Sequence, residues 1–295
     1  MADAAQLDFD ILAPPFWTAP AVFNSPHSGR RYDARFLEQS RLSLHQLRRS
    51  EDCCIDELFS GCLELGAPML RAHVPRSYID LNREPYELDP RLFAEPLPAF
   101  ANAASPRVAG GLGTIPRIVA ENEDIYRRKL PLSEGLSRIE KVYRPYHRAL
   151  AALLDRIHGE TGLALLVDCH SMPSSAANHL PTGNGKSVDV VLGDRFGVSC
   201  AEEITAAAER CLQALGLNVV RNRPYAGGFI TQNYGSVRAG RHAVQIEVNR
   251  ALYLNENTLE KLPSFGKLQA ALTEMAGELI HAVRALEQPQ RYAAE

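Results

Sequence analysis

One short stretch constrains the fold of this chain more than any other. It is Leu163-Ala-Leu-Leu-Val-Asp-Cys-His-Ser171, in which five apolar residues run directly into an acid, a thiol, an imidazole and a hydroxyl. A short continuous apolar run predicts a strand that is buried on both faces, as in a parallel sheet covered by helices. Polar residues at the C-terminal end of such a strand lie where open α/β sheets bind ligands. We therefore expect His170 at a functional site.

The rest of the chain alternates between strand and helix patterns. Strands are predicted over 21–24, 69–74, 189–193, 217–221 and 242–250, and helices over 43–65, 133–158, 199–215 and from 263 onward. This alternation predicts a three-layer α/β/α sandwich with a mixed, mostly parallel sheet. We expect one domain over residues 1–295, with a long proline-rich loop at about 85–118 that lies near the site.

Three local signals refine the predicted helices. Ser43 with Gln46, and Ser199 with Glu202, each have the spacing of a capping box and predict the start of a helix. Pro145 predicts a kink in the helix over 133–158.

Composition excludes several classes of protein. The net charge is −3 and no long basic run is present, which argues against a protein dedicated to nucleic acids or to anionic membranes. The sequence has no apolar stretch of about 18 residues and no signal-peptide layout, so we expect a cytoplasmic protein without a membrane span. The six cysteines form no C-x-x-C pair, and scattered reduced thiols are expected.

Two further residues are candidates for the same site. His27 lies on the turn Ser25-Pro-His-Ser-Gly29, directly after a predicted strand, although a lone loop histidine is more often simply solvated. Glu247 lies in an alternating strand, where it shares one face with Ala243 and Gln245. A carboxylate in such a strand is costly unless it is paired or functional.

Two charged segments add further candidates. The segment 75–83 contains Arg76, Asn82 and Arg83, and the rigid fork of arginine is suited to binding carboxylates, although a structural Arg–Asp network explains the segment equally well. The predicted helix over 43–65 carries Glu51, Asp52, Asp56 and Glu57, for which a solvated face is the alternative interpretation.

Together these residue types can supply metal-assisted amide hydrolysis. Two histidines and a carboxylate are a hydrolytic zinc set, and a further glutamate can take the proton from water. An arginine can stabilise the oxyanion, and an Asn–Arg pair can hold a substrate carboxylate.

Five motifs in order make the chain resemble a known family over residues 20–255. They are Pro26-His-Ser-Gly29, Asp80-Leu-Asn-Arg83, Asp168-Cys-His-Ser171, Val191-Leu-Gly-Asp194 and Gln245-Ile-Glu-Val-Asn-Arg250. With these motifs the sequence resembles the N-formylglutamate amidohydrolases. The resemblance implies the fold of zinc carboxypeptidases and aspartoacylases and one bound Zn²⁺.

The resemblance also implies residue roles. His27 and His170 correspond to the first and last zinc ligands, and Glu247 corresponds to the general base. Arg76 corresponds to the oxyanion or carboxylate donor, and the substrate-binding set is Asn82, Arg83 and Arg250.

One departure from the related carboxypeptidases concerns the acidic metal ligand. Those enzymes have an H-x-x-E motif, but the third residue after His27 is Arg30, which cannot be a ligand. Asp52 is our first choice for the acid, and Asp56 and Glu51 are the alternatives.

The expected activity is hydrolysis of N-formyl-L-glutamate, or of a similar small acidic N-acyl amino acid, to formate and L-glutamate. Alternatives are a deacylase or carboxypeptidase for another acidic N-acyl amino acid, and a metal-free binding protein of the same fold. A serine or cysteine hydrolase using Ser171 or Cys169 is disfavoured, because no G-x-S-x-G elbow surrounds Ser171.

Overall fold

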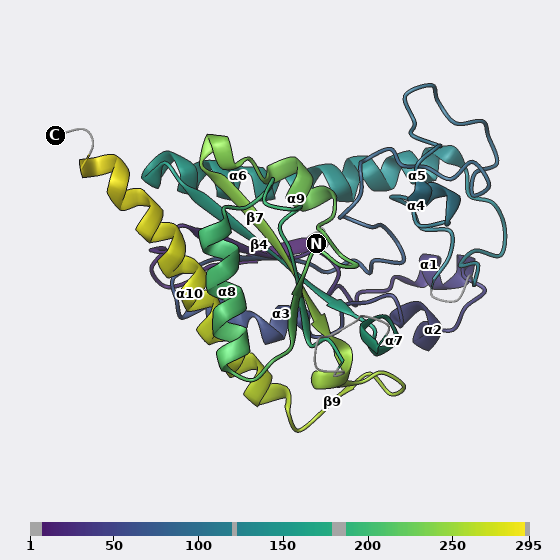
Figure 1. Ribbon diagram of the computed structural model, residues 1–295. Coiled ribbons are helices and arrows are strands. Elements are labelled where there is room, and N and C mark those ends of the chain that lie inside the picture. The colour runs from purple at the N-terminus through teal and green to yellow at the C-terminus, as the bar shows by residue number, and fades with distance from the viewer. Residues whose placement is uncertain (1–7, 120–122, 179–186, 293–295) are drawn as a thin grey trace, which may run out of the picture. The chain divides into compact units, whose positions relative to one another are not determined.

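The computed structural model describes residues 8–119, 123–178 and 187–292, whose elements are labelled in Figure 1. The chain forms two compact units. The first contains the chain up to Asp10, Pro26–Cys53 and Arg71–Ala149, and the second contains Ile11–Ser25, Cys54–Leu70 and the chain from Leu150 onward. The organisation into a single domain, expected from the sequence, stays a prediction.

A mixed seven-stranded sheet is the main element, as the sequence predicts. Its strand order is β1 (Phe9–Leu12), β3 (Met69–Ala72), β2 (Ala21–Ser25), β4 (Ala164–Met172), β7 (Arg241–Asn249), β5 (Val190–Gly193) and β6 (Val219–Arg221). The pairs β2–β4, β4–β7 and β5–β6 are parallel, whereas β5–β7 is antiparallel. A small separate ribbon joins β8 (Leu254–Asn255) to β9 (Glu260–Lys261).

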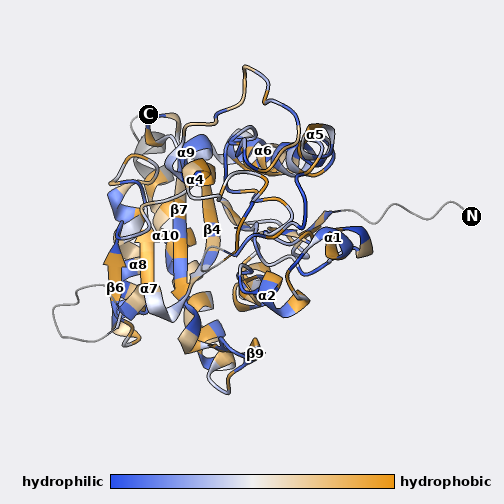
Figure 2. Ribbon diagram, turned by 90° about the vertical axis from the view of Figure 1, so that its right-hand side faces the viewer, coloured by the Kyte–Doolittle hydropathy of each residue, from blue (hydrophilic) through white to orange (hydrophobic). Residues whose placement is uncertain are grey.

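Strand β4 lies at the centre of the second unit. All nine of its residues are buried, and Figure 2 shows most of the strand in the orange of apolar residues. Asp168 pairs with Asn24 of β2 and with Gln245 of β7, and His170 pairs with Glu247. Because paired residues of a sheet share a face, these polar side chains lie on one face of the sheet.

The opposite face of β4 is part of the core. Cys169 is fully buried there, and burial raises the pKa of its thiol well above the ordinary value. A thiol of this kind is inert, which agrees with the expectation that Cys169 is not a catalytic nucleophile.

The helices of the second unit pack on this sheet. They are α3 (Ile55–Leu58), the 3₁₀ turns Ser60–Leu63, Val237–Ala239 and Arg250–Leu252, α7 (Ser174–Asn178), α8 (Glu202–Ala214), α9 (Phe229–Tyr234) and α10 (Phe265–Tyr292). Helices α8 and α10 lie side by side, α3 and α10 contact β4, and α9 contacts β4 and β7 (Figure 1). Among the described residues, no helix combines the length and the apolar character that crossing a bilayer requires.

Shorter helices dominate the first unit. They are α1 (Ala34–Gln39), α2 (Leu44–Arg48), α4 (Pro106–Ala109) and α5 (Leu132–Arg138), followed by a π-helical turn (Ile139–Tyr143) and the start of α6 (Arg144–Thr161). The predicted loop over 85–118 contains α4 and several buried apolar side chains, including Leu88, Leu92 and Phe93, so it is not structureless.

The helix predicted over 133–158 is confirmed, and its irregularity lies just before Pro145. Arg144 donates its backbone N–H to Ile139 O, a bond between residues five apart that defines the π-turn. Proline lacks an N–H and its ring clashes with the carbonyl four residues earlier, so a wider turn accommodates it.

The single helix predicted over 43–65 is wrong. The capping box of Ser43 and Gln46 is confirmed at the start of α2, but α2 ends at Arg48. Cys54 then adopts a left-handed conformation with φ of 61°, which a helix interior cannot contain, and α3 starts after it. Asp52 therefore lies between helices and shares no helix face with Asp56.

The second predicted capping box is also wrong. The N-cap of α8 is Ala201, and the Ser199 hydroxyl donates instead to Ala243 O at 2.8 Å. The hydroxyl is thus used to link the chain before α8 to strand β7 of the sheet.

Candidate functional site

In the first unit, His27 is held between two buried acids. Its Nε2–H donates to Asp80 Oδ1 at 2.8 Å, and its Nδ1 lies 3.4 Å from Asp52 Oδ2. The backbone N–H of Asp52 also donates to His27 O at 3.0 Å, which holds the two residues together through the main chain. His27, Asp52 and Asp80 are each at most 2% exposed, so solvent does not screen these contacts.

The turn that carries His27 is packed tightly against the chain after β3. A Cβ atom on Gly29 would lie 1.9 Å from Val74 O, so no other residue fits there without moving the backbone. This close approach explains the glycine of the Pro26–Gly29 motif.

Asp80 is the centre of a charge network. Its Oδ2 accepts a hydrogen bond from Arg76 Nε at 3.0 Å and forms an ion pair with Arg83 Nη2 at 3.2 Å, while Oδ1 accepts from the Asn82 backbone N–H at 2.9 Å. Burial raises the pKa of Asp80, but Arg83, Arg76 and His27 more than offset this and hold that pKa well below its ordinary value. Burial also lowers the pKa of Arg83 to about 10.

Asp80 was not among the predicted site residues, although it is part of one of the five motifs. The two predicted functional arginines of the segment 75–83, Arg76 and Arg83, bind it, which is the Arg–Asp network that the sequence left as an equal alternative. The spacing could have identified Asp80, because this acid lies four residues after Arg76 and three residues before Arg83.

The other acids considered for a metal have different surroundings. Glu51 accepts hydrogen bonds from Tyr32 Oη at 2.7 Å and from Arg48 Nε at 3.2 Å. Asp56 lies on α3 in the second unit, where it is buried. Asp52, by contrast, lies 3.4 Å from His27 Nδ1 within the first unit.

In the second unit, His170 is oriented by an acid of its own strand. Its Nε2–H donates to Asp168 Oδ2 at 2.9 Å, and Asn24 Nδ2 donates to Asp168 Oδ1 at 2.7 Å. All three residues are at most 2% exposed. Asn24 was not among the predicted site residues, although it lies near the end of an apolar strand as Asp168 does.

Glu247 lies beside His170 across the β4–β7 pair. It accepts a hydrogen bond from Gln245 Nε2 at 2.7 Å, and Gln245 Oε1 accepts from the Gly228 backbone N–H at 2.8 Å. The second bond fixes which way the Gln245 amide points, so its N–H is directed at Glu247. Gln245 is a second supporting residue that the sequence did not identify.

Arg250 lies just beyond the end of β7. Its Nε donates to Ser171 Oγ at 3.0 Å, and both side chains are buried. The second unit therefore gathers an imidazole, a carboxylate and a guanidinium toward the carboxyl ends of two neighbouring parallel strands, where α/β sheets bind ligands.

Both histidines share one arrangement, in which a buried carboxylate accepts from Nε2. An ionised carboxylate can only accept, so in a neutral imidazole this contact favours the tautomer with the proton on Nε2 and the lone pair on Nδ1. Histidines that bind metals commonly donate their other ring N–H to a carboxylate, which fixes the ring and raises its basicity. The two imidazoles thus have the support that metal ligands require.

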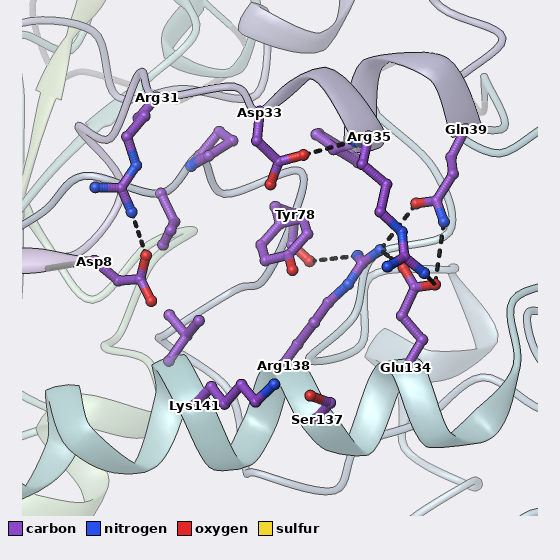
Figure 3. Close-up of a pocket in the computed structure, with 14 residues that line it drawn as sticks. Asp8, Arg31, Asp33, Arg35, Gln39, Tyr78, Glu134, Ser137, Arg138 and Lys141 are labelled. Atoms are coloured by element: carbon purple, nitrogen blue, oxygen red, sulfur yellow. Dashed lines mark hydrogen bonds and ion pairs between the residues drawn. The ribbon is translucent and has the colours of Figure 1, made fainter. Parts of the chain in front are cut away.

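The pocket drawn in Figure 3 belongs to the first unit and has a volume of about 260 Å³. Its charged lining residues are Asp8, Arg31, Asp33, Arg35, Glu134, Arg138 and Lys141. None of the predicted site residues is among the 14 that line it.

Comparison with known proteins places the chain in a family. The sequence profile described as N-formylglutamate amidohydrolase matches residues 19–254. The N-formylglutamate deformylase of Pseudomonas aeruginosa is 32% identical over 245 residues, covering 80% of this chain and 83% of that protein. The enzyme of the same name from Pseudomonas putida is 32% identical over 244 residues, covering 80% and 82%.

Solved structures agree with this placement. The crystal structure of N-formylglutamate amidohydrolase from Ralstonia eutropha JMP134 superposes with a TM-score of 0.88 at 34% identity, covering 95% of this chain and 99% of that one. A protein of Agrobacterium tumefaciens with a TM-score of 0.64 and 18% identity, covering 96% and 97%, shares the fold. The chain therefore belongs to the family of N-formylglutamate amidohydrolases, which are hydrolases that act on an amide bond.

Proposed function

We propose that this chain is a metal-dependent amidohydrolase that cleaves N-formyl-L-glutamate to formate and L-glutamate. The observation that carries the proposal is the pair of buried histidines, each with Nε2 on a buried carboxylate and Nδ1 as the basic nitrogen. The substrate comes from the names of the relatives, and the four arginine and asparagine side chains near these histidines suit its two carboxylates.

The metal would be held by His27, Asp52 and His170. Two imidazoles and one carboxylate are the donor set of a hydrolytic zinc site, and the support of both rings fits that role. When bound, Zn²⁺ would polarise the formyl carbonyl and lower the pKa of water.

Glu247 would act as the general base. Its carboxylate is buried and oriented by Gln245, so it can take a proton from the attacking water and pass it to the leaving nitrogen. Water then adds to the formyl carbon, the C–N bond breaks, and formate and the free amine of L-glutamate result.

The substrate carboxylates would be bound by Arg76, Asn82, Arg83 and Arg250. A guanidinium carries five N–H donors, so contact with Asp80 does not exhaust the capacity of an arginine. The Arg76 side chain is 28% exposed and that of Arg83 is 10% exposed. Arg76 is therefore the better placed of the two for a direct contact with the oxyanion or a carboxylate.

The substitution Glu247→Gln tests the mechanism. We expect the variant to retain metal but to lose turnover of N-formyl-L-glutamate by at least about 100-fold, since proton transfer by a positioned base contributes on that order. Metal content would be measured on protein purified without chelators. Glu209→Gln in α8, a carboxylate paired with Arg221, is the control and should remain active. Near wild-type turnover by Glu247→Gln would rule out this residue as the base.

A substrate panel tests the specificity. Formyl, acetyl and peptidyl derivatives of glutamate and aspartate would separate the proposed activity from a deacylase or carboxypeptidase for another acidic N-acyl amino acid. We expect the highest kcat/KM for N-formyl-L-glutamate. Protein that contains no metal and hydrolyses no member of the panel would instead support a binding protein of the same fold.

A further inference from the structure

The helix that contains the π-turn holds the backbone of the segment 78–83, which carries Asp80, Asn82 and Arg83. Three side chains of this helix donate to three carbonyl oxygens of the segment. The bonds run from Arg138 Nη1 to Tyr78 O at 3.1 Å, from His147 Nε2 to Leu81 O at 2.9 Å and from Tyr143 Oη to Arg83 O at 2.6 Å. All of these residues belong to the first unit.

The π-turn makes this set of contacts possible. In a regular α-helix, residues five apart such as Arg138 and Tyr143 are separated by about 140° around the axis. The π-turn over Ile139–Tyr143 contains one extra residue, so a spacing of five there acts like a spacing of four in a regular helix. Arg138, Tyr143 and His147 therefore reach the same side of the helix, toward the segment 78–83.

The three donors are fixed by their own neighbours. The rings of Tyr143 and His147 are stacked with centroids 4.1 Å apart, and Tyr143 is only 4% exposed. Figure 3 shows Arg138 extending from its helix toward Tyr78. The guanidinium carbon of Arg138 lies 3.9 Å from the centroid of the Tyr78 ring. Arg138 also donates to Glu134 Oε1 at 2.6 Å. Little rotamer freedom is left to any of the three.

The segment is also fixed from its other side. The backbone N–H of Asp80 donates to Thr114 O at 2.8 Å, and Arg83 Nε donates to Leu112 O at 2.9 Å. These bonds hold the backbone on both sides of Asp80 and so limit how far its Cα can move relative to His27.

We propose that Tyr143 and His147 are positioning residues for the hydrolysis, placed by the π-turn so that they hold the segment 78–83. The inference rests on the proposed function, because it concerns the segment that presents Asp80 to His27 and Arg83 to the substrate. Tyr143 acts through the backbone carbonyl of Arg83, and His147 acts through that of Leu81. Asp80 transmits the effect to His27, and Arg83 transmits it to the substrate carboxylate.

The test compares Tyr143→Phe with Tyr86→Phe. Each substitution removes one hydroxyl that forms a hydrogen bond. The Tyr143 hydroxyl donates to Arg83 O in the segment 78–83, whereas the Tyr86 hydroxyl accepts from Arg144 Nη2. We expect Tyr143→Phe to speed amide hydrogen exchange of residues 78–83 by about tenfold and to weaken Zn²⁺ binding several-fold. Tyr86→Phe should leave both at the wild-type value.

His147 supplies a rescue experiment. His147→Phe keeps an aromatic ring beside Tyr143 but removes the donor to Leu81 O, so faster exchange and weaker Zn²⁺ binding are expected. His147→Gln restores an N–H donor at a similar reach and should recover most of the loss. If His147 had a merely structural role, His147→Phe and His147→Gln would have similar thermal midpoints, and His147→Gln would not recover the exchange rate or the Zn²⁺ affinity.

These outcomes separate the inference from the proposed function. Exchange and Zn²⁺ affinity need no turnover, so wild-type protein without N-formyl-L-glutamate hydrolysis would contradict only the proposed reaction. For active protein, we also expect a rise of about tenfold in KM for Tyr143→Phe with a smaller change in kcat, because Arg83 is displaced. If Tyr143→Phe and Tyr86→Phe show equal exchange over 78–83 and equal Zn²⁺ affinity, the inference is wrong.

Discussion

The two histidines show the same chemical device built in two different ways. In the second unit, His170 and the acid that orients it are two residues apart on one strand, and the acid accepts from the neutral amide of Asn24. In the first unit, His27 and Asp80 are 53 residues apart, and Asp80 lies on a loop with two arginines. A strand places residues i and i+2 on one face without further help, whereas a loop needs many contacts to present one carboxylate.

Because of this difference, we expect the acid of the first unit to affect both stability and metal binding, and the acid of the second unit to affect mainly metal binding. Around Asp80, charge balance, backbone bonds and ring orientation depend on one another, so a single change disturbs all three. Around Asp168, the strand is held by its sheet partners, and the carboxylate mainly orients His170. Substitutions of the two acids should therefore have different consequences.

The largest effect is expected for Asp80→Asn. The substitution leaves Arg83 buried without its counter-charge, and breaking a buried pair in this way costs about 3–5 kcal/mol. It also removes the carboxylate behind His27, so Zn²⁺ affinity should fall by about 100-fold. Chemical denaturation and competition with a chromogenic chelator would measure the two effects.

Asp89→Asn is the matched control for that substitution. Asp89 is a buried acid of the same unit that also binds two arginines, Arg91 and Arg117, each with a shortest distance of 2.8 to 2.9 Å. The Asp89→Asn variant should be less stable than the wild type but should bind Zn²⁺ with the same affinity. Equal Zn²⁺ affinities of the Asp80 and Asp89 variants would refute the role assigned to Asp80.

A smaller effect is expected for Asp168→Asn. Asp168 accepts from the neutral amide of Asn24 and from the ring of His170, so the free energy of unfolding should fall by only about 1–2 kcal/mol. Zn²⁺ affinity should still fall by about 10- to 100-fold, because an amide no longer selects the Nε2–H tautomer of His170.

Asp194→Asn controls for the loss of a buried acid in the second unit. Asp194 accepts from Asn222 Nδ2 at 2.7 Å, much as Asp168 accepts from Asn24. Its substitution should leave Zn²⁺ affinity unchanged. If Asp168→Asn destabilises the protein as much as Asp80→Asn does, the contrast between strand-borne and loop-borne support is wrong.

The smallest effect concerns pH and the support of the loop. Burial raises the pKa of Glu134, but its contacts with Arg138 outweigh this, so the pKa in the folded protein lies below the ordinary value of 4.5. A lowered carboxylate pKa stabilises the fold fully above about pH 4.5, and this stabilisation is lost as pH falls through the folded-state pKa.

Glu134→Gln tests this contribution. The variant should be less stable than the wild type by about 1 kcal/mol at pH 7, and the difference should shrink below pH 4. Urea titrations at several pH values would measure it. Glu134 orients Arg138, and Arg138 in turn donates to Tyr78 O, so Glu134 acts on the segment 78–83 only indirectly. The Zn²⁺ affinity of the variant should therefore change only slightly. A stability difference that grows at low pH would contradict the assigned direction.

Several parts of the molecule follow from local sequence. The apolar run before Asp168 specifies a buried strand, and alternation in β7 puts Gln245 and Glu247 on one face. The capping box at Ser43 starts α2, and Pro145 marks the irregular point of the long helix. In each of these, the deciding interaction spans only a few residues, so residue type and spacing contain the information.

Other parts were decided by the tertiary structure. The partner of His27 lies 53 residues away, the break at Cys54 places Asp52 beside His27, and Tyr143 finds its acceptor 60 residues earlier in the chain. Local propensity favoured one helix over 43–65, but α2 ends at Arg48 and the left-handed conformation of Cys54 separates it from α3. The sequence thus identified both histidines as candidates, and the i, i+2 spacing on one strand already places Asp168 beside His170. Only the packing of distant segments determined that Asp80 orients His27, since that pairing depends on distances that no local pattern encodes.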